Sequence, residues 1–270
     1  MIALCWCYGN KQGNEMKVIQ VGVGGFGRHW LRLLSEFPGV ELVGLVDIAD
    51  ENLEEAAGVS GVPLDLCFDV LEKALIETTA DALICVSPPD YHRAHVTAAM
   101  SAGLDVICEK PVAIDMDDAL VIARCARETG RLMVVSQNYR YRPLTWTMRR
   151  LAADGEIGKI GQISLDFFKG WYFTSKDFRR TMAQPLLADM GIHHFDLLRF
   201  VTGLEAVSVR GESWNPPWSK NSGDTSASLT FILDNGARFI YSASWCAQGD
   251  FTDWNGIQEK ENDDKGNDFQ

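Results

Sequence analysis

The sequence lacks the features of a membrane or secreted protein. No stretch approaches the roughly 20 apolar residues that a membrane-spanning helix needs. The opening residues, MIALCWCYGNKQGNE, lack the basic region and the small-residue cleavage site of a signal peptide. Positive charge is scarce, since 25 Lys and Arg stand against 37 Asp and Glu and give a net charge of -12. Such a surface repels phosphate backbones and anionic lipid, so we expect no nucleic acid or membrane partner.

A disulfide framework is also missing. The seven cysteines are odd in number, and most lie within apolar strand or helix patterns. This usage is typical of reduced thiols in the cytosol, and we therefore expect a cytoplasmic protein. Cys5 and Cys7 form an isolated C-x-C, which without partner ligands is weak evidence for a metal.

The pattern after the first 15 residues, which we interpret as an extension, alternates short apolar runs with helical periods. Strands are predicted at 17–22, 40–47, 81–86, 104–108 and 131–136, and helices at 25–36, 50–58, 69–77, 90–102 and 115–129. Such βαβ units make a parallel sheet that is covered on both faces. We predict a doubly wound Rossmann domain over residues 16–137, with Asp115 as the N-cap of its last helix.

The second half has a different pattern of apolar residues. Long alternating segments predict strands at 159–168, 205–213, 226–234 and 237–245. The last two are joined by Asn235-Gly236, a strong hairpin signal. We predict an α+β domain over residues 138–257 with a large open, mostly antiparallel sheet, followed by a disordered acidic tail over 258–270.

A glycine-rich turn follows the first predicted strand. Gly22, Gly24 and Gly27 form G-x-G-x-x-G where the strand closes and a helix opens. In a dinucleotide-binding turn the three glycines permit the tight turn, the approach of the pyrophosphate and the close packing of helix on strand. The helix N-terminus then offers N–H groups to the phosphates. The alternative is a purely structural glycine turn.

An acid ends the second predicted strand. Asp47 lies about 20 residues after the last glycine of the turn, where a carboxylate accepts hydrogen bonds from the ribose hydroxyls and repels a 2′-phosphate. Ile48 follows where an NADP enzyme often offers a basic residue. We therefore expect NAD rather than NADP, the alternative being a solvated aspartate.

Candidate site residues follow the next three strands, at the sheet edge where Rossmann folds place their chemistry. They are Ser87, Pro88 and His92 after the third strand, Glu109 and Lys110 after the fourth, and Asn138 and Arg140 after the fifth. Lys110 lies between a buried strand and a proline, so that it either faces a cleft or is an ordinary surface lysine. His92 either caps a helix or lines the cofactor cleft.

Asp189 and His193 lie four residues apart, on one face of a predicted helix. A carboxylate beside an imidazole is the arrangement of a general base. The alternatives are an aspartate that complements the helix dipole beside a packed histidine, and a metal site that adds His194 and Asp196. Adjacent histidines point about 100° apart on a helix, which disfavours the metal site, and we expect no metal.

These motifs together resemble the glucose-fructose oxidoreductase / inositol dehydrogenase (Gfo/Idh/MocA) family. VGVGGFG, Asp47, SPPDYH, EKP and a D-x-G-x-H-x-x-D octet occur in that order, and the resemblance covers about residues 16–250. It implies that a cleft between a Rossmann domain and an open-sheet domain holds nicotinamide and a sugar or polyol. It implies catalytic roles for Lys110, Asp189 and His193, with Asn138 and Arg140 near the nicotinamide or substrate. The implied cofactor contacts are Gly22, Gly24, Gly25, Phe26, Gly27, Asp47, Ser87, Pro88, His92, Glu109 and Lys110.

The C-terminal part departs from this family, whose members run on for several strands beyond the one that ends here near Trp245. We interpret the substrate domain as truncated. Whether copies of the chain associate into a homo-oligomer through its C-terminal sheet stays an open alternative. The expected activity is hydride transfer from a hydroxyl-bearing carbon to NAD. The alternatives are an NAD-dependent glycoside-cleaving enzyme of the same family and a non-catalytic NAD-binding sensor or remnant.

Overall fold

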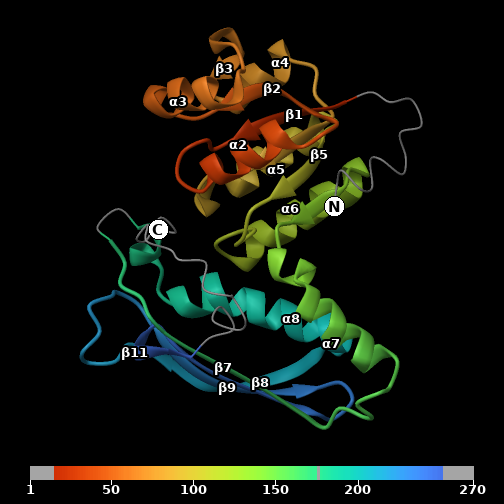
Figure 1. Ribbon diagram of the computed structural model, residues 1–270, viewed down its shortest axis with the longest axis vertical. Helices are drawn as coiled ribbons and strands as arrows, with labels where there is room; N and C mark the ends of the chain where they lie inside the picture. Colours follow the sequence, from red (N-terminus) through yellow and green to blue (C-terminus); the bar gives the residue numbers. More distant parts are fainter. Residues whose placement is uncertain (1–14, 175–176, 252–270) are drawn as a thin grey trace. The chain divides into compact units, whose positions relative to one another are not determined.

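The computed structural model describes residues 15–174 and 177–251. The chain divides into two compact units, residues 1–137 and 138–270 (Figure 1). The N-terminal extension up to residue 14, with Cys5 and Cys7, and the predicted acidic tail at 258–270 lie outside the described residues. Among the helices that are described, none is long and apolar enough to cross a membrane.

The first unit is built on a parallel sheet of six strands in the order β3-β2-β1-β4-β5-β6. This is the strand order of a dinucleotide-binding Rossmann fold, and it confirms the predicted fold class. The strands are β1 Met16–Val21, β2 Val40–Val46, β3 Cys67–Phe68, β4 Ala82–Cys85, β5 Asp105–Cys108 and β6 Met133–Val135. The two-residue β3 was not predicted, because a strand that short has no detectable period.

Helices cover both faces of this sheet. One apolar cluster joins α4, α5 and α6 to the strands, whereas α2 and α3 pack in a separate cluster. The helices are α2 Gly27–Glu36, α3 Asp50–Ser60, α4 Leu71–Glu77, α5 Pro89–Ser101 and α6 Met116–Thr129. The predicted N-cap of α6 is confirmed, since the Asp115 carboxylate accepts a hydrogen bond from the backbone N–H of Asp118 at 2.9 Å.

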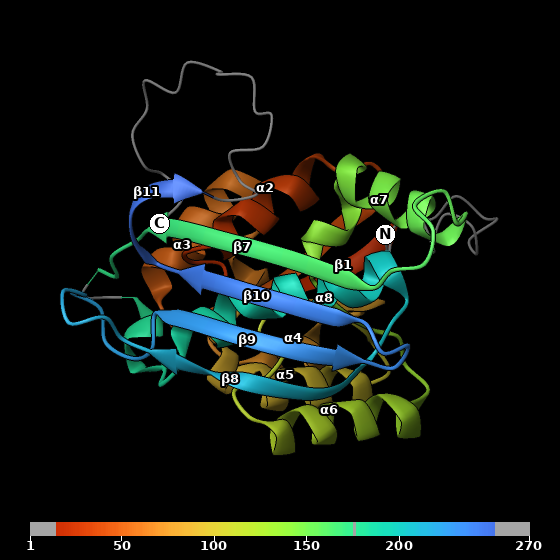
Figure 2. The same ribbon diagram turned by 90° about the horizontal axis from the view of Figure 1, so that it is seen from below.

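The second unit contains a sheet of five strands in the order β11-β7-β10-β9-β8 (Figure 2). Its strands are β7 Gln162–Gly170, β8 Ala206–Trp214, β9 Ser226–Leu233, β10 Arg238–Ser244 and β11 Cys246–Phe251. The predicted hairpin is confirmed, with β9 and β10 antiparallel and Gly236 at a φ of 85° in the turn. Only the β7–β10 pairing is parallel among the described strands of this sheet, so the mostly antiparallel prediction holds.

Helices α7 (Pro143–Ala153) and α8 (Ile192–Thr202) lie on one face of this second sheet (Figure 1). Phe195 and Leu198 of α8 pack with Phe239 and Tyr241 of the sheet in one apolar core. Helix α7 was not predicted, although a proline at its first position, Pro143, is a helix-start signal.

The helix that was predicted to open at Asp189 differs in its first part. A π-helical turn spans Leu186–Gly191, and the regular helix α8 begins at Ile192. Short 3₁₀ turns occupy Leu64–Leu66, Asn138–Tyr141 and Phe178–Thr181. The prediction that Asp189 and His193 lie on one face assumed a continuous α-helix. The wider π-turn changes the angle between the two side chains about the helix axis.

Candidate active site residues in the two units

The glycine-rich turn between β1 and α2 is closed by backbone contacts. A Cβ on Gly27 would lie 2.1 Å from the carbonyl oxygen of Gly22, and one on Gly22 would lie 2.6 Å from the backbone nitrogen of Ser87. Gly22 also has a φ of 82°, in the left-handed region that other residues rarely adopt. These two positions therefore require glycine for packing. A Cβ on Gly24 would meet only the side chain of Asn52, and space around Gly25 is open.

Asp47 fastens this turn to the beginning of α3. Its Oδ2 accepts hydrogen bonds from the backbone N–H groups of Val23 at 3.0 Å and Gly24 at 3.2 Å. Its Oδ1 accepts from the backbone of Ala49 and the side chain of Asn52, both at 3.0 Å. The carboxylate that the sequence predicts for the ribose is therefore also the group that shapes the glycine turn.

Gln20 on β1 contacts the same turn from within the sheet. It was not predicted from the sequence as a site residue. Its side chain is buried, and Nε2 donates to the carbonyl oxygens of Gly22 at 3.0 Å and Gly27 at 2.8 Å. A lone amide inside the apolar run KVIQV was the available signal, because a buried polar group needs hydrogen-bond partners.

Helix α2 begins at this turn with features that suit an anion. In the described structure its N-cap residue, Phe26, makes no capping hydrogen bond, and the first turn contains no acidic residue. The first turn of α2 therefore carries no carboxylate of its own at the positive end of the helix dipole, which favours a phosphate there.

The ends of β4 and β5 carry the other predicted residues of the first unit. Glu109 accepts a hydrogen bond from the Trp30 indole at 2.8 Å and another from the backbone N–H of Lys110 at 3.1 Å. His92 is fully buried, with its ring nitrogens 2.9 Å from the carbonyl oxygen of Pro111 and 2.7 Å from that of Ser87. His92, one of the predicted cofactor contacts, thus contacts the loops after β4 and β5 from the protein interior.

In the second unit, Asp189 is 1% exposed and forms an ion pair that was not predicted. Its Oδ2 accepts a hydrogen bond from Nε of Arg179 at 2.8 Å, and Asp177 accepts from the same guanidinium at 3.2 Å. Burial opposes the charge on Arg179, yet the two carboxylates raise its pKa above the ordinary value. Arg179 is therefore a cation held permanently beside the predicted catalytic aspartate.

His193 lies against an aromatic ring that was also missed. The imidazole stacks on the Tyr139 ring with centroids 4.5 Å apart and planes inclined by 11°. The guanidinium of Arg142 lies 3.5 Å from the centroid of the same tyrosine ring. Since Tyr139 and His193 are both nearly buried, this stack fixes the plane of the imidazole.

The members of the alternative metal set have other partners. His194 is buried beside the Tyr241 hydroxyl, 3.1 Å from Nδ1, and burial, followed by the charge of Arg142, lowers its pKa to about 4. Asp196 receives two hydrogen bonds from Arg140, at 2.7 and 2.5 Å. Both side chains are thus engaged in packing and ion pairing.

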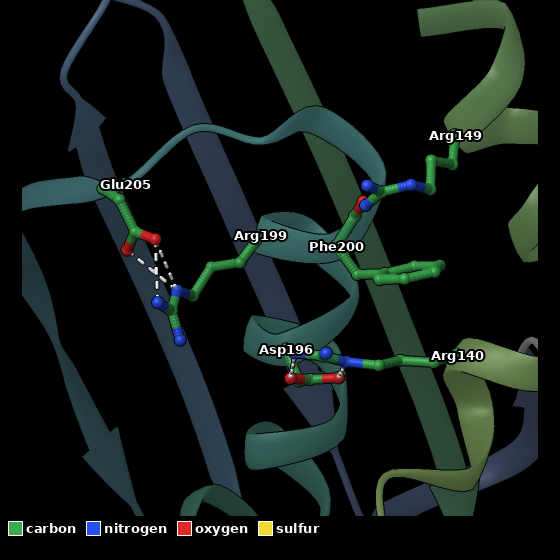
Figure 3. A network of polar contacts seen from close by, with 6 residues as sticks. All are labelled: Arg140, Arg149, Asp196, Arg199, Phe200 and Glu205. Atoms are coloured by element: carbon green, nitrogen blue, oxygen red, sulfur yellow. Dashed lines mark hydrogen bonds and ion pairs between the residues drawn. The ribbon is translucent and has the colours of Figure 1, made fainter. Parts of the chain in front are cut away.

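Arg140 belongs to a network that fixes α8 (Figure 3). Its guanidinium lies over the Phe200 ring at 5.2 Å, and that of Arg149 lies over the same ring and donates to the Phe200 carbonyl oxygen. Arg199 forms a second bidentate pair with Glu205. The guanidinium of Arg140, which the sequence predicts near a substrate, is thus already paired with Asp196. Asn138 is exposed on its 3₁₀ turn.

The strand order, the glycine turn and the acid at the end of β2 define a dinucleotide-binding protein of the Rossmann type. Residues 16–137 match the model of an oxidoreductase family with an NAD-binding Rossmann fold, and residues 145–257 match the GFO/IDH/MocA C-terminal domain. The chain belongs to the Gfo/Idh/MocA family. Its first unit is accordingly an NAD-binding domain.

Individual relatives agree with this assignment. The chain is 30% identical over 244 residues to the protein y4oX of Sinorhizobium fredii, covering 88% of this chain and 68% of that protein. It is 27% identical over 247 residues to scyllo-inositol 2-dehydrogenase (NAD(+)) of Bacillus subtilis, covering 86% and 68%. A crystal structure of an Agrobacterium radiobacter oxidoreductase with NAD+, L-tartaric acid and magnesium matches with a TM-score of 0.79 at 22% identity, covering 87% and 68%. The chain thus spans about two thirds of the length of these relatives.

Proposed function

We propose that the protein is an NAD-dependent dehydrogenase that oxidises a CH–OH group of a sugar, polyol or related compound. The observation that carries this proposal is the glycine turn bound by the Asp47 carboxylate in a chain of this oxidoreductase family. The similarity to an enzyme named scyllo-inositol 2-dehydrogenase (NAD(+)) supports the substrate class. We assign cofactor binding to residues 16–137 and substrate binding to residues 138–257, in keeping with the two compact units.

The residues of the first unit fit NAD. Bare backbone at Gly24 and Gly25 leaves room for a pyrophosphate at the beginning of α2. Asp47 supplies negative charge where a 2′-phosphate would lie, which disfavours NADP. Gly22, Phe26, Gly27, Ser87, Pro88 and Glu109 shape the same strand edge, and Gln20 and His92 support it from within. When bound, NAD would supply the hydride acceptor.

The proton chemistry falls to three side chains. His193 accepts the proton of the substrate hydroxyl, and Lys110 donates a hydrogen bond to the same oxygen and stabilises its developing negative charge. Asp189 offsets the positive charge that His193 gains, and Arg179 donates a hydrogen bond to this buried carboxylate. Tyr139 keeps the imidazole plane fixed through the stack.

Calorimetric titration with NAD and NADP, followed by an NADH absorbance screen over sugars and polyols, tests the proposal. We expect NAD to bind more tightly than NADP and at least one panel member to yield NADH. Release of free sugar from a glycoside without net NADH would replace the dehydrogenase with the glycoside-cleaving alternative. Binding without any turnover would favour the sensor, and folded protein that binds neither nucleotide would refute the cofactor assignment.

A further inference from the structure

Two cysteines face one another inside the first unit and have no role in the proposed reaction. Cys85 is the last residue of β4 and Cys108 the last of β5, and they are direct partners in the parallel ladder. Both are fully buried, and their sulfur atoms lie within 4.8 Å of each other. Neighbouring strands are about 4.8 Å apart, within the Cα separation of about 4.4–6.8 Å that a disulfide spans.

His92 lies beside this pair. One of its ring nitrogens lies within 4.8 Å of both sulfur atoms. Both nitrogens are at hydrogen-bond distance from carbonyl oxygens, of Pro111 and Ser87. These two contacts hold the ring in place next to the sulfur atoms.

The two thiols divide into a nucleophile and a proton holder. A hydrogen bond from Cys108 lowers the pKa of Cys85 well below its ordinary value, against the effect of burial, and His95 and His92 act in the same direction. The same contact, together with burial, raises the pKa of Cys108. A thiolate beside a thiol is the starting state for disulfide formation.

We propose that Cys85 and Cys108 are a dithiol that hydrogen peroxide oxidises reversibly to a disulfide between β4 and β5. The Cys85 thiolate attacks one peroxide oxygen, the O–O bond breaks, and a sulfenic acid forms with release of hydroxide. The Cys108 sulfur then displaces the sulfenic hydroxyl and loses its proton, and the S–S bond forms. Overall the two thiols lose two electrons and two protons, and peroxide becomes two waters.

The contacts of His92 favour this chemistry over a metal site. A metal ligand needs a deprotonated ring nitrogen, and here both nitrogens point at carbonyl oxygens. The disulfide would join the strand ends that lead to Ser87 and Lys110, two residues beyond the cysteines on each side. Oxidation thus acts on the two loops that carry proposed site residues.

Peptide mapping of the full chain tests the proposal without cofactor or turnover. Trypsin cuts after Lys73, Arg93 and Arg124 but not between Lys110 and Pro111, so Cys85 and Cys108 fall in separate peptides, 74–93 and 94–124. After peroxide treatment, alkylation and digestion without reductant, we expect these two peptides to be joined. The thiols of Cys85 and Cys108 should both be lost, and dithiothreitol should restore both.

Matched variants identify the pair. Cys125→Ala, which removes a half-buried thiol of α6, should keep the joined peptides, whereas Cys108→Ala should abolish them. His92→Gln keeps a donor but removes the imidazole that lowers the pKa of Cys85, and should slow disulfide formation without slowing oxidation of Cys67. Folded wild-type protein that yields both peptides as free thiols while Cys67 is oxidised would overturn the proposal. A disulfide from either cysteine to a different partner would also overturn it.

Discussion

Single residues of the glycine turn differ in what they tolerate. Gly27 meets the backbone of Gly22, which cannot move away, whereas Gly24 meets the end of a flexible side chain. The motif G-x-G-x-x-G predicts a separate role for each glycine. The structure adds how strictly each position requires glycine.

Gly27→Ala is expected to destabilise the first unit by more than about 4 kcal/mol, because its Cβ would overlap a backbone oxygen. Gly58, which is exposed on α3 and where an added Cβ would meet nothing within 4 Å, is the matched control. Gly58→Ala should stabilise by about 0.5–1 kcal/mol. Urea unfolding measures both, and an unaffected Gly27→Ala protein would contradict the packing argument.

Lys110→Ala is expected to lower kcat by about 10²–10³-fold while NAD still binds, because in the proposed mechanism this lysine stabilises the substrate oxygen as an oxyanion donor does. Lys73→Ala is the control, since Lys73 pairs with Asp69 on the surface. Stopped-flow or steady-state NADH absorbance gives the rates, and normal turnover in Lys110→Ala would remove this lysine from the mechanism.

At the scale of elements, contacts between separate segments stabilise the second unit. The 3₁₀ turn Phe178–Thr181 brings Arg179 to the π-turn that holds Asp189, and the 3₁₀ turn Asn138–Tyr141 brings Tyr139 to His193 of α8. Arg140 and Arg149 fix the end of α8 through Asp196 and Phe200. The candidate base is thus held by contacts from three neighbouring elements.

Arg179→Met should lower the free energy of unfolding by about 3–5 kcal/mol, because it removes one partner of a buried ion pair with Asp189. The double variant Arg179→Met/Asp189→Asn should recover much of this loss. Guanidinium unfolding of the three proteins gives the double-mutant comparison. Equal stabilities of the single and double variants would show that the ion pair does not decide the stability here.

His194 should make the second unit sensitive to acid. Its pKa is about 4 in the folded protein against 6.5 ordinarily, so below pH 6.5 the unfolded chain binds the proton first. The contribution to stability is fully present above pH 6.5 and is lost as the pH falls to 4, by about 3 kcal/mol in all. Chemical unfolding of wild type and His194→Gln across this range measures the difference, which should vanish if His194 titrates normally.

At the scale of the whole molecule, the two compact units have separate apolar cores. NAD should stabilise the protein through the first unit, by about 2.7 kcal/mol when NAD is present at 100 times its dissociation constant. The rise in Tm on calorimetric scanning should be larger with NAD than with NADP. Asp47→Ala should reduce the NAD effect and, because four hydrogen bonds are lost, lower the stability of the free protein by about 2 kcal/mol or more.

The sequence predicted the fold because its signals are local. Period and turn chemistry placed the strands of the first unit within a residue or two, the Asp115 cap and the Asn235-Gly236 hairpin. Family motifs marked the glycine turn and the residues at the strand ends. The two-residue β3 has no readable period and was missed for that reason, whereas α7 was missed although Pro143 marks its beginning.

Side-chain partners were decided only by the tertiary structure. Asp47 binds the glycine turn, Arg140 is committed to Asp196, and Asp189 is held by Arg179, although none of these pairs is close in sequence. Likewise Cys85 and Cys108 became partners only through the register of β4 and β5. The sequence by itself determined which elements form and where the chemistry-bearing residues stand on them. Packing decided which of those residues meet, because such contacts depend on the arrangement of elements and not on the spacing along the chain.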